Sequence, residues 1–456
     1  MLTWEKLLNN VRRKDLHGPA ESTGTRGGRT ECERDYDRIL FATPTRRLAD
    51  KTQVFPMEVN DSVRTRLTHS HEVSNLARSI GVRLAFEHAD AVFGPDHEML
   101  QVKRNVPSML AAVGLAHDLG NPPFGHQGEI AIQQWFQEGK AGADVPIDFL
   151  EFDGNAQTFR LLTRLQLLND KFGLNLTLGT LAALVKYPSI YGSSDKGGFK
   201  KYGIFQSEGQ IVEEVWHQTG LAPGIRHPLA YVMEACDDIA YSVIDAEDTV
   251  KKGYASFYDL MDFLQSFGGG DRAIGNVVEF SQAKNKQFKL EQLSSRELND
   301  MSMQMFRVKA IHEMVQAATE TFVDNIGKMM AGTIGPGFEL IKNSPCTQLC
   351  KAAKEFARRH GFQHREVLRL ELKGNRYIKS MMDTLWRAIL RGNDPNSPFE
   401  RFVFGEISEN YRRVYSAAGG SAYARCQLLC DVLSGMTESY LMHKHAEFSS
   451  LDNAAT

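Results

Sequence analysis

Residues 114–129 read GLAHDLGNPPFGHQGE, a stretch in which an apolar run ends in a group of ionisable side chains. At helical spacing His117 continues the apolar stripe of Leu110 and Val113, so we expect its imidazole to point into the core. Asp118 follows directly, and a carboxylate beside the core is costly unless a cation accompanies it. Because an isolated His-Asp pair is most often a histidine bonded to its neighbour, other segments must show whether chemistry is involved.

The composition indicates a soluble globular protein. The 456 residues are 42% hydrophobic and 24% charged, which are ordinary values for that class. A formal charge of -3 argues against a chain that coats nucleic acid or an anionic membrane, although a local basic site is compatible with it. The sequence has no signal peptide and no run near the ~18 apolar residues of a membrane span, so we expect a cytoplasmic protein without a membrane partner.

The six cysteines are too few in so long a chain for a disulfide framework, so we expect reduced thiols. Cys346 and Cys350 share a helical face, as do Cys426 and Cys430. A zinc site of four thiolates is conceivable, but this spacing is not the two-residue gap of zinc ribbons.

The dominant sequence period is helical. Val73, Ile80 and Leu84 form one apolar stripe, and long amphipathic runs fill the C-terminal third, whereas the alternation typical of strands is scarce. The sequence therefore predicts an all-α fold. We expect one large helical domain, with residues from about 330 onward as a helical C-terminal extension.

Two further segments carry side chains that can bind a metal. His69 lies on the stripe of Val73, so it also points inward. Asp237, Tyr241 and Asp245 recur at helical spacing along one face. Two imidazoles and two carboxylates suit Mn²⁺, Mg²⁺, Fe²⁺, Ni²⁺ or Zn²⁺ and leave positions for water and substrate. The predicted metal ligands are His69, His117, Asp118 and Asp237.

The order of these ligands resembles that of the HD-domain metal phosphohydrolases, which are helical. The blocks KTQVFP, VRTRLTHS, DGNAQTFRL, MEACDDIAYSVIDAEDTV and LLCDVLSGMTESY resemble, in their order, the dGTP triphosphohydrolase family from about residue 34 to about residue 442. Such ordered blocks are far more specific than a lone His-Asp pair. The resemblance implies an HD-domain fold in three parts: an N-terminal segment, 1–33, an HD-type catalytic core, 34–330, and a helical C-terminal extension, 331–456, that contributes to the nucleotide site. It also implies metal-dependent hydrolysis, with Mn²⁺ or Mg²⁺ favoured. It further implies attack at the α-phosphorus of a deoxynucleoside triphosphate, preferably dGTP, with release of deoxynucleoside and tripolyphosphate.

The resemblance also implies roles for residues beyond the metal ligands. His126 and Glu129 match catalytic positions, and their spacing lets the glutamate orient the imidazole and stabilise its protonated form. By spacing alone, a surface histidine beside a first-turn glutamate would be equally expected. The implied substrate-binding residues are Gln53, Arg66, Asn155, Lys186, Tyr187, Lys201, Tyr241, Asp245 and Arg425.

Eight of these substrate-binding residues fall into three groups, and Asn155 is implied to line the site. Arg66, Lys186, Tyr187 and Lys201 are implied phosphate contacts, and Arg46, Arg47 and Lys200 are further basic residues nearby. The resemblance implies that the deoxyribose is surrounded by Gln53, Tyr241 and Asp245. The phenol of Tyr241, packed at C2′, would reject a ribose hydroxyl. The resemblance implies that Arg425 recognises guanine. The chemistry allows this, since arginine can bind the O6/N7 edge of guanine bidentately.

Two other functions are compatible with these residues. One is an HD-type phosphomonoesterase or phosphodiesterase, and the other is a non-catalytic module that binds nucleic acid or a dNTP. The pair His126 and Glu129 argues against the second. The resemblance implies a homo-oligomer, typically a hexamer, and single-stranded nucleic acid or a dNTP effector are further conceivable partners.

Overall fold

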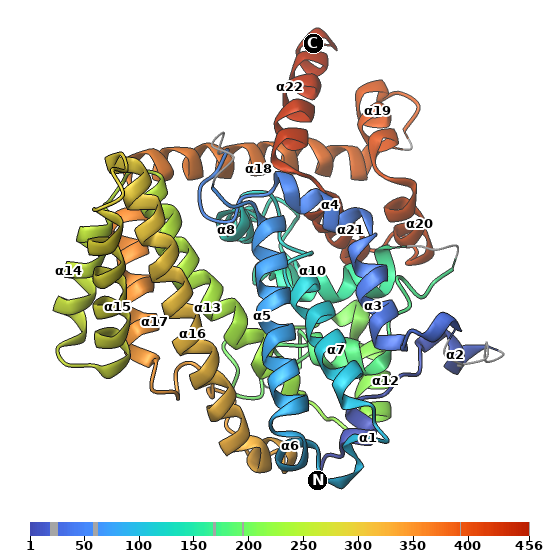
Figure 1. Ribbon diagram of the computed structural model, residues 1–456. Coiled ribbons are helices and arrows are strands. Elements are labelled where there is room, and N and C mark those ends of the chain that lie inside the picture. The colour runs from blue at the N-terminus through green and yellow to red at the C-terminus, as the bar shows by residue number, and fades with distance from the viewer. Residues whose placement is uncertain (19–25, 58–62, 167–169, 194–195, 393, 456) are drawn as a thin grey trace.

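The structure is a computed structural model that describes residues 1–18, 26–57, 63–166, 170–193, 196–392 and 394–455. Within these ranges the chain is all-α, as the helical period predicts, and its extended pairings are isolated bridges such as Thr52 with Thr65. Figure 1 shows the helices gathered around α5, α7 and α13, with the two termini at opposite ends of the molecule.

The first half of the chain contains α1 (Trp4–Leu7), α2 (Arg13–His17), η1 (Arg26–Gly28), α3 (Glu31–Leu40), α4 (Thr43–Arg47), η2 (Leu48–Asp50), α5 (Arg66–Phe86), α6 (Ala89–Phe93), η3 (Pro95–His97), α7 (Val102–Ala116), α8 (Gly125–Gln137), α9 (Ile147–Leu150), α10 (Gly154–Arg160), η4 (Leu161–Leu165), α11 (Leu178–Leu184), η5 (Gln206–Glu208) and α12 (Gly209–Thr219). The second half contains α13 (Pro228–Lys251), α14 (Phe257–Gly268), α15 (Arg272–Phe288), α16 (Ser295–Met330), α17 (Thr347–Phe356), η6 (Ala357–Phe362), α18 (Arg365–Arg391), α19 (Pro398–Glu406), α20 (Glu409–Ala417), α21 (Ala422–Ser434) and α22 (Glu438–Ala455).

The close packing of α5 on α7 positions two predicted metal ligands. The apolar stripes predicted for both helices are buried. At their crossing, a Cβ on Gly114 would lie only 2.8 Å from the Cα of Ser74, so a larger residue would push the helices apart. Because the backbones meet here, His69 near the start of α5 and His117 just after α7 have ring centroids 5.5 Å apart.

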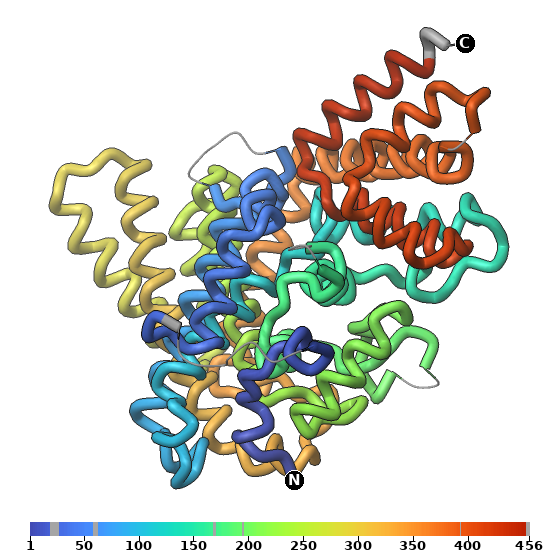
Figure 2. Tube along the Cα trace, turned by 90° about the vertical axis from the view of Figure 1, so that its right-hand side faces the viewer, coloured from blue at the N-terminus to red at the C-terminus, as the bar shows by residue number. Residues whose placement is uncertain are grey.

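The C-terminal helices cover one end of the molecule (Figures 1 and 2). The long helix α18 packs against α8, and α19, α21 and α22 pack against α18. Helix α17 instead packs on α13. Segments from the last quarter of the chain therefore lie beside the loop and helix that follow the His117-Asp118 pair.

Candidate active site and metal centre

The four predicted metal ligands converge where α5, α7 and α13 meet. Nε2 of His69 lies 3.3 Å from Oδ1 of Asp237. Nε2 of His117 lies 3.4 Å from Oδ2 of Asp118 and 3.6 Å from the same Oδ1 of Asp237. Potential ligand atoms of His69, His117 and Asp118 all lie within 4.8 Å of one another. Two imidazoles and two carboxylates are thus brought to one point.

The hydrogen bonds of the two histidines fit a metal ion. Nδ1 of His117 donates to the carbonyl oxygen of Gly114 at 2.7 Å, which leaves the lone pair of Nε2 directed toward the carboxylates. Nε2 of His117 and Nδ1 of His69 are buried, and neither has a hydrogen-bond partner among the described residues. A cation on Nε2 of His117 would satisfy an atom that is otherwise buried at a cost.

The electrostatics of the cluster also favour a cation. Burial lowers the pKa of His117, but Asp118 and Asp237 outweigh burial and raise it to about 10. Burial raises the pKa of Asp118, but Arg66 and His117 outweigh burial and hold it well below its usual range. A divalent ion would supply the positive charge that the His117 imidazolium otherwise provides, and its binding would release that proton.

A cavity of about 380 Å³ opens beside these ligands, a size suited to a small-molecule ligand. Its lining includes three of the predicted metal ligands, His117, Asp118 and Asp237. It also includes the predicted catalytic and substrate-binding residues His126, Glu129, Gln53, Arg66, Asn155, Lys186, Lys201 and Tyr241. Segments far apart in the sequence therefore meet around one cavity.

His126 and Glu129 lie in the first turns of α8, and their predicted contact is confirmed. Nδ1 of His126 is 3.1 Å from Oε2 of Glu129, whose Oε1 accepts a hydrogen bond from the backbone N–H of Gly154 at 2.7 Å. The hydrogen bond to Glu129 raises the pKa of His126 against the opposing effect of burial. Because the carboxylate is fixed from both sides, it can orient the imidazole and favour its protonated form.

Comparison with known proteins agrees with this geometry. A sequence model described as a phosphohydrolase-associated domain matches residues 342–447. A deoxyguanosinetriphosphate triphosphohydrolase-like protein of Listeria monocytogenes is 33% identical to the chain, with 99% of this chain and 100% of the relative aligned. One of Synechocystis is 34% identical, with 96% and 97% aligned. A probable deoxyguanosinetriphosphate triphosphohydrolase of Pseudomonas aeruginosa is 32% identical, with 96% of both chains aligned.

The chain belongs to the dGTP triphosphohydrolase-like family. The all-α fold and the matched phosphohydrolase-associated region agree with an HD phosphohydrolase, a class that uses a divalent metal. The cluster of His69, His117 and Asp118, together with the adjacent Asp237, fits that requirement. Across the described ranges, the helices lack the combined length and apolar character needed to cross a lipid bilayer.

Three cationic side chains of this dGTP triphosphohydrolase-like chain reach the cavity. Arg66 donates through Nη1 to Oδ2 of Asp118. Nζ of Lys201 lies 2.5 Å from Asp153, and Nζ of Lys186 lies 3.5 Å from Glu234. The cavity wall thus offers positive charge to an anionic ligand. The further basic residues considered from the sequence, Arg46, Arg47 and Lys200, do not line this cavity.

Three predicted substrate contacts lie outside the cavity lining. Asp245 is fully buried, because eight residues along α13 rotate its side chain by about 80° from that of Asp237. Tyr187 packs edge-on against Phe199, with ring centroids 6.2 Å apart. Arg425 lines a different cavity beside α18. In the single chain, a ligand in the cavity beside the metal centre would meet none of these three side chains directly.

Nine residues that line the cavity were not predicted as site residues: Thr52, Val54, Pro56, Asn121, Phe124, Gln127, Met233, Phe362 and Glu371. Phe362 ends η6, and Glu371 lies on α18. Burial raises the pKa of Glu371, against the opposing effect of His126. The local sequence carries no signal for Phe362 or Glu371, because the packing of α18 on α8 brings them to the cavity. Val54 lies in the block KTQVFP, where the resemblance drew attention to its neighbour Gln53.

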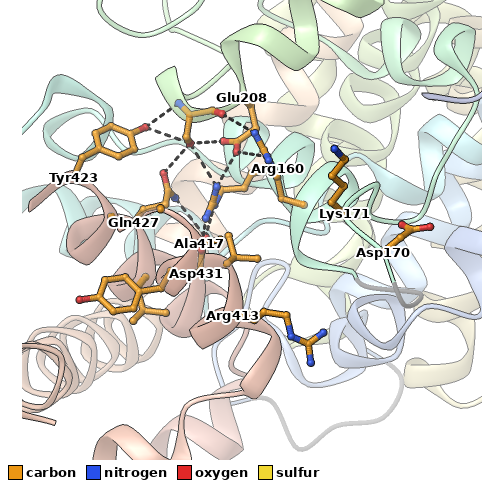
Figure 3. Close-up of a pocket in the computed structure, with 16 residues that line it drawn as sticks. Arg160, Asp170, Lys171, Glu208, Arg413, Ala417, Tyr423, Gln427 and Asp431 are labelled. Carbon is orange, nitrogen blue, oxygen red and sulfur yellow. Dashed lines mark hydrogen bonds and ion pairs between the residues drawn. The ribbon is translucent and has the colours of Figure 1, made fainter. Parts of the chain in front are cut away.

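A second cavity, of about 510 Å³, lies between η4, η5, α20 and α21 (Figure 3). Arg160 is 2.7 Å from both Glu208 and Asp431, and all three side chains are buried. Lys171 and Arg413 lie apart from this network in Figure 3. Because Arg160 belongs to the same helix as Asn155, α10 contributes to both cavities and is tied to α21 by a buried ion-pair network.

The thiols do not form the conceivable zinc site. All six cysteines are buried and free. Among the described residues, the candidate metal-binding group consists of two histidines and an aspartate and includes no cysteine. Burial raises the pKa of Cys426 to about 12, so this thiol stays protonated near neutral pH.

Proposed function

We propose that the protein hydrolyses deoxynucleoside triphosphates, preferably dGTP, to the deoxynucleoside and tripolyphosphate, with Mn²⁺ or Mg²⁺ bound by His69, His117, Asp118 and Asp237. The supporting observation is that one cavity joins three of these candidate ligands, His117, Asp118 and Asp237, to the His126–Glu129 pair and to three cationic side chains. The relatives named as dGTP triphosphohydrolase-like proteins suggest the same reaction class.

The residues of the cavity have separate tasks in this reaction. His69, His117, Asp118 and Asp237 would hold a divalent ion, which would supply positive charge and Lewis acidity toward a phosphate oxygen. Arg66, Lys186 and Lys201 bind the remaining phosphate oxygens of the triphosphate, whose charge of about -4 needs several cations. Water attacks the α-phosphorus, forms the new P–O bond and releases a proton to solvent. His126 is held by Glu129 and can donate its proton to the 5′-oxygen as the bond from that oxygen to the α-phosphorus breaks.

Product analysis tests the proposal. The purified protein is incubated with each dNTP and Mn²⁺, and the products are separated by ion-exchange chromatography. We expect deoxynucleoside and tripolyphosphate in equal amounts, with dGTP consumed fastest. Release of orthophosphate or pyrophosphate would instead support an HD-type phosphomonoesterase or phosphodiesterase, and an unchanged dNTP with retained binding would support a non-catalytic module.

The sugar contacts predict discrimination between dGTP and GTP. Tyr241 lies one helical turn beyond Asp237 and lines the cavity, and Oε1 of Gln53 is buried with no hydrogen-bond partner among the described residues. We expect kcat/KM for dGTP to exceed that for GTP by about one to two decades, because a 2′-hydroxyl meets the phenol ring. A 2′,3′-dideoxy substrate should also be poor, since it leaves Gln53 unpaired, at a cost of about 1–3 kcal/mol.

Tyr241→Ala should abolish the discrimination, whereas Tyr241→Phe should keep it because the ring remains. Steady-state kinetics with dGTP and GTP check both variants. Equal kcat/KM for the two nucleotides in the wild type would refute a sugar gate. Discrimination that persists in Tyr241→Ala would place the gate on another residue.

We expect the carboxylate of Glu371 to recognise guanine and so to favour dGTP. A carboxylate can accept both N–H groups on the Watson–Crick edge of guanine, and Phe362 supplies a ring in the same cavity. Glu371→Gln should lower kcat/KM for dGTP by about tenfold or more relative to dATP, which corresponds to about 1–3 kcal/mol. Competition assays with mixed dNTPs measure this ratio, and Glu366→Gln on the exposed face of the same helix is the control. An unchanged dGTP-to-dATP ratio in Glu371→Gln would remove Glu371 from base recognition.

A further inference from the structure

One carboxylate from the end of the chain connects two segments of the active site. Glu438 begins α22 and is 4% exposed. Its Oε1 accepts hydrogen bonds from the backbone N–H of Thr52 at 2.6 Å and of Phe124 at 2.9 Å. Its Oε2 accepts a hydrogen bond from the hydroxyl of Thr52 at 2.7 Å. The carboxylate therefore receives three donors from two separate segments.

The first branch leads from Glu438 to a metal ligand. The carbonyl oxygen of Thr52 accepts hydrogen bonds from Nε and Nη2 of Arg66 at 3.1 and 2.8 Å. Nη1 of the same guanidinium donates to Asp118. Glu438 thus fixes the N–H and hydroxyl of Thr52, and the carbonyl of Thr52 orients the arginine that holds Asp118. Consecutive hydrogen bonds of this kind strengthen one another in a buried environment.

The second branch leads from Glu438 to the catalytic pair. Phe124 immediately precedes α8 and has a left-handed backbone conformation with φ 62°, which costs a non-glycine residue about 1 kcal/mol or more. The hydrogen bond from its N–H to Glu438 helps hold this conformation. Since His126 follows two residues later, the backbone of Phe124 sets where α8 begins and where the imidazole lies.

The two branches also touch each other. Gly125 has φ +53°, and a Cβ there would lie 2.6 Å from Nη2 of Arg66. The start of α8 therefore packs directly on the guanidinium that binds Asp118. A shift of either segment would disturb the other, which makes their common anchor important for both.

We propose that Glu438 is a positioning residue that fixes the metal ligand Asp118 and the acid–base residue His126 relative to each other. This inference rests on the proposed function, because it assumes those two roles. It assigns to the phosphohydrolase-associated region, 342–447, a direct part in the order of the active site. Glu438 itself acts through Thr52, Arg66 and Phe124.

Glu438→Gln tests the proposal with almost no change in size. The amide has one acceptor oxygen, and its NH₂ group would face hydrogen-bond donors. We expect kcat to fall by about 10–100-fold and the affinity for Mn²⁺ to weaken by a similar factor, as for other partners of metal ligands. KM should change less than kcat, since Glu438 does not line the cavity and reaches the phosphate contact Arg66 only through Thr52. Mn²⁺ binding is measured by electron paramagnetic resonance in the absence of nucleotide.

Asp50→Asn is the matched control. Asp50 accepts hydrogen bonds from the N–H and hydroxyl of Ser439 at 3.2 and 2.9 Å, so it joins the same two segments on the exposed side. We expect this variant to keep the kcat and Mn²⁺ affinity of the wild type. Equal losses in both variants would show that Glu438 only connects the C-terminal helices to the core, and wild-type values in a folded Glu438→Gln would also overturn the proposal.

A milder variant covers the case in which Glu438→Gln does not fold. Thr52→Val keeps the shape of the side chain but removes the hydroxyl donor, and we expect about a fivefold loss of kcat and of Mn²⁺ affinity. No loss in Thr52→Val would overturn the proposal. If the wild type hydrolyses no dNTP, the proposed function fails, whereas the comparison of Mn²⁺ affinities still decides whether Glu438 positions Asp118.

Discussion

Replacing His126 with alanine is expected to lower kcat by about 10²–10⁴-fold, the usual contribution of a general acid or base. The metal content and the free energy of unfolding should stay close to those of the wild type, because the His126 side chain is 73% exposed and stands apart from the four candidate ligands. Steady-state kinetics, metal analysis and denaturant unfolding measure these quantities. Near-wild-type turnover, or loss of the metal, would contradict the role assigned to His126.

Two companion variants separate the tasks within the site. His117→Ala should lose the metal, which distinguishes a ligand from a proton donor. Glu129→Gln removes the charge that raises the pKa of His126, so the pH at which His126 loses its proton should fall. The corresponding limb of the profile of kcat against pH should therefore move to lower pH. A limb that stays in place would exclude Glu129 as the partner that sets this pKa.

Replacing Arg160 with methionine is expected to lower the free energy of unfolding by about 3–5 kcal/mol, because removal of one partner leaves uncompensated buried charge. Arg160 is 5% exposed, and its partners Glu208 and Asp431 are buried with it. Urea denaturation followed by circular dichroism measures the change. Arg164→Met is the control, since the Arg164 side chain is 37% exposed and its nearest carboxylate lies 3.6 Å away. A loss below about 1 kcal/mol in Arg160→Met would match a surface ion pair and contradict this account.

The fold and the ligand cluster follow from periodic patterns in the sequence. The apolar stripes of α5 and α7 predict that His69 and His117 both face the core, and the structure places their rings side by side. The contact between His126 and Glu129 follows from their spacing on one helix. In each case the relevant partners share a helix or a buried face, so local periodicity contains the information.

The remaining features depend on contacts between distant segments. Glu371 lies on the amphipathic helix α18 and Glu438 begins α22, and the local sequence does not reveal which neighbour either carboxylate meets. Asp245 shares a helical face with Asp237 only approximately, and the difference in direction over two turns places it in the interior. The role of Arg425 rests on the resemblance alone, and the single chain places this side chain beside another cavity.

The metal centre also links parts of the chain that folding must bring together. Its candidate ligands lie on α5, on α13 and directly after α7, and the cavity beside it reaches α18. An ion that binds only the folded chain therefore acts as a reversible cross-link between these segments. By mass action, a concentration one hundred times the dissociation constant would add about 2.7 kcal/mol to the stability of the native state. The availability of the metal would thus affect the equilibrium stability of the folded protein as well as its catalytic rate.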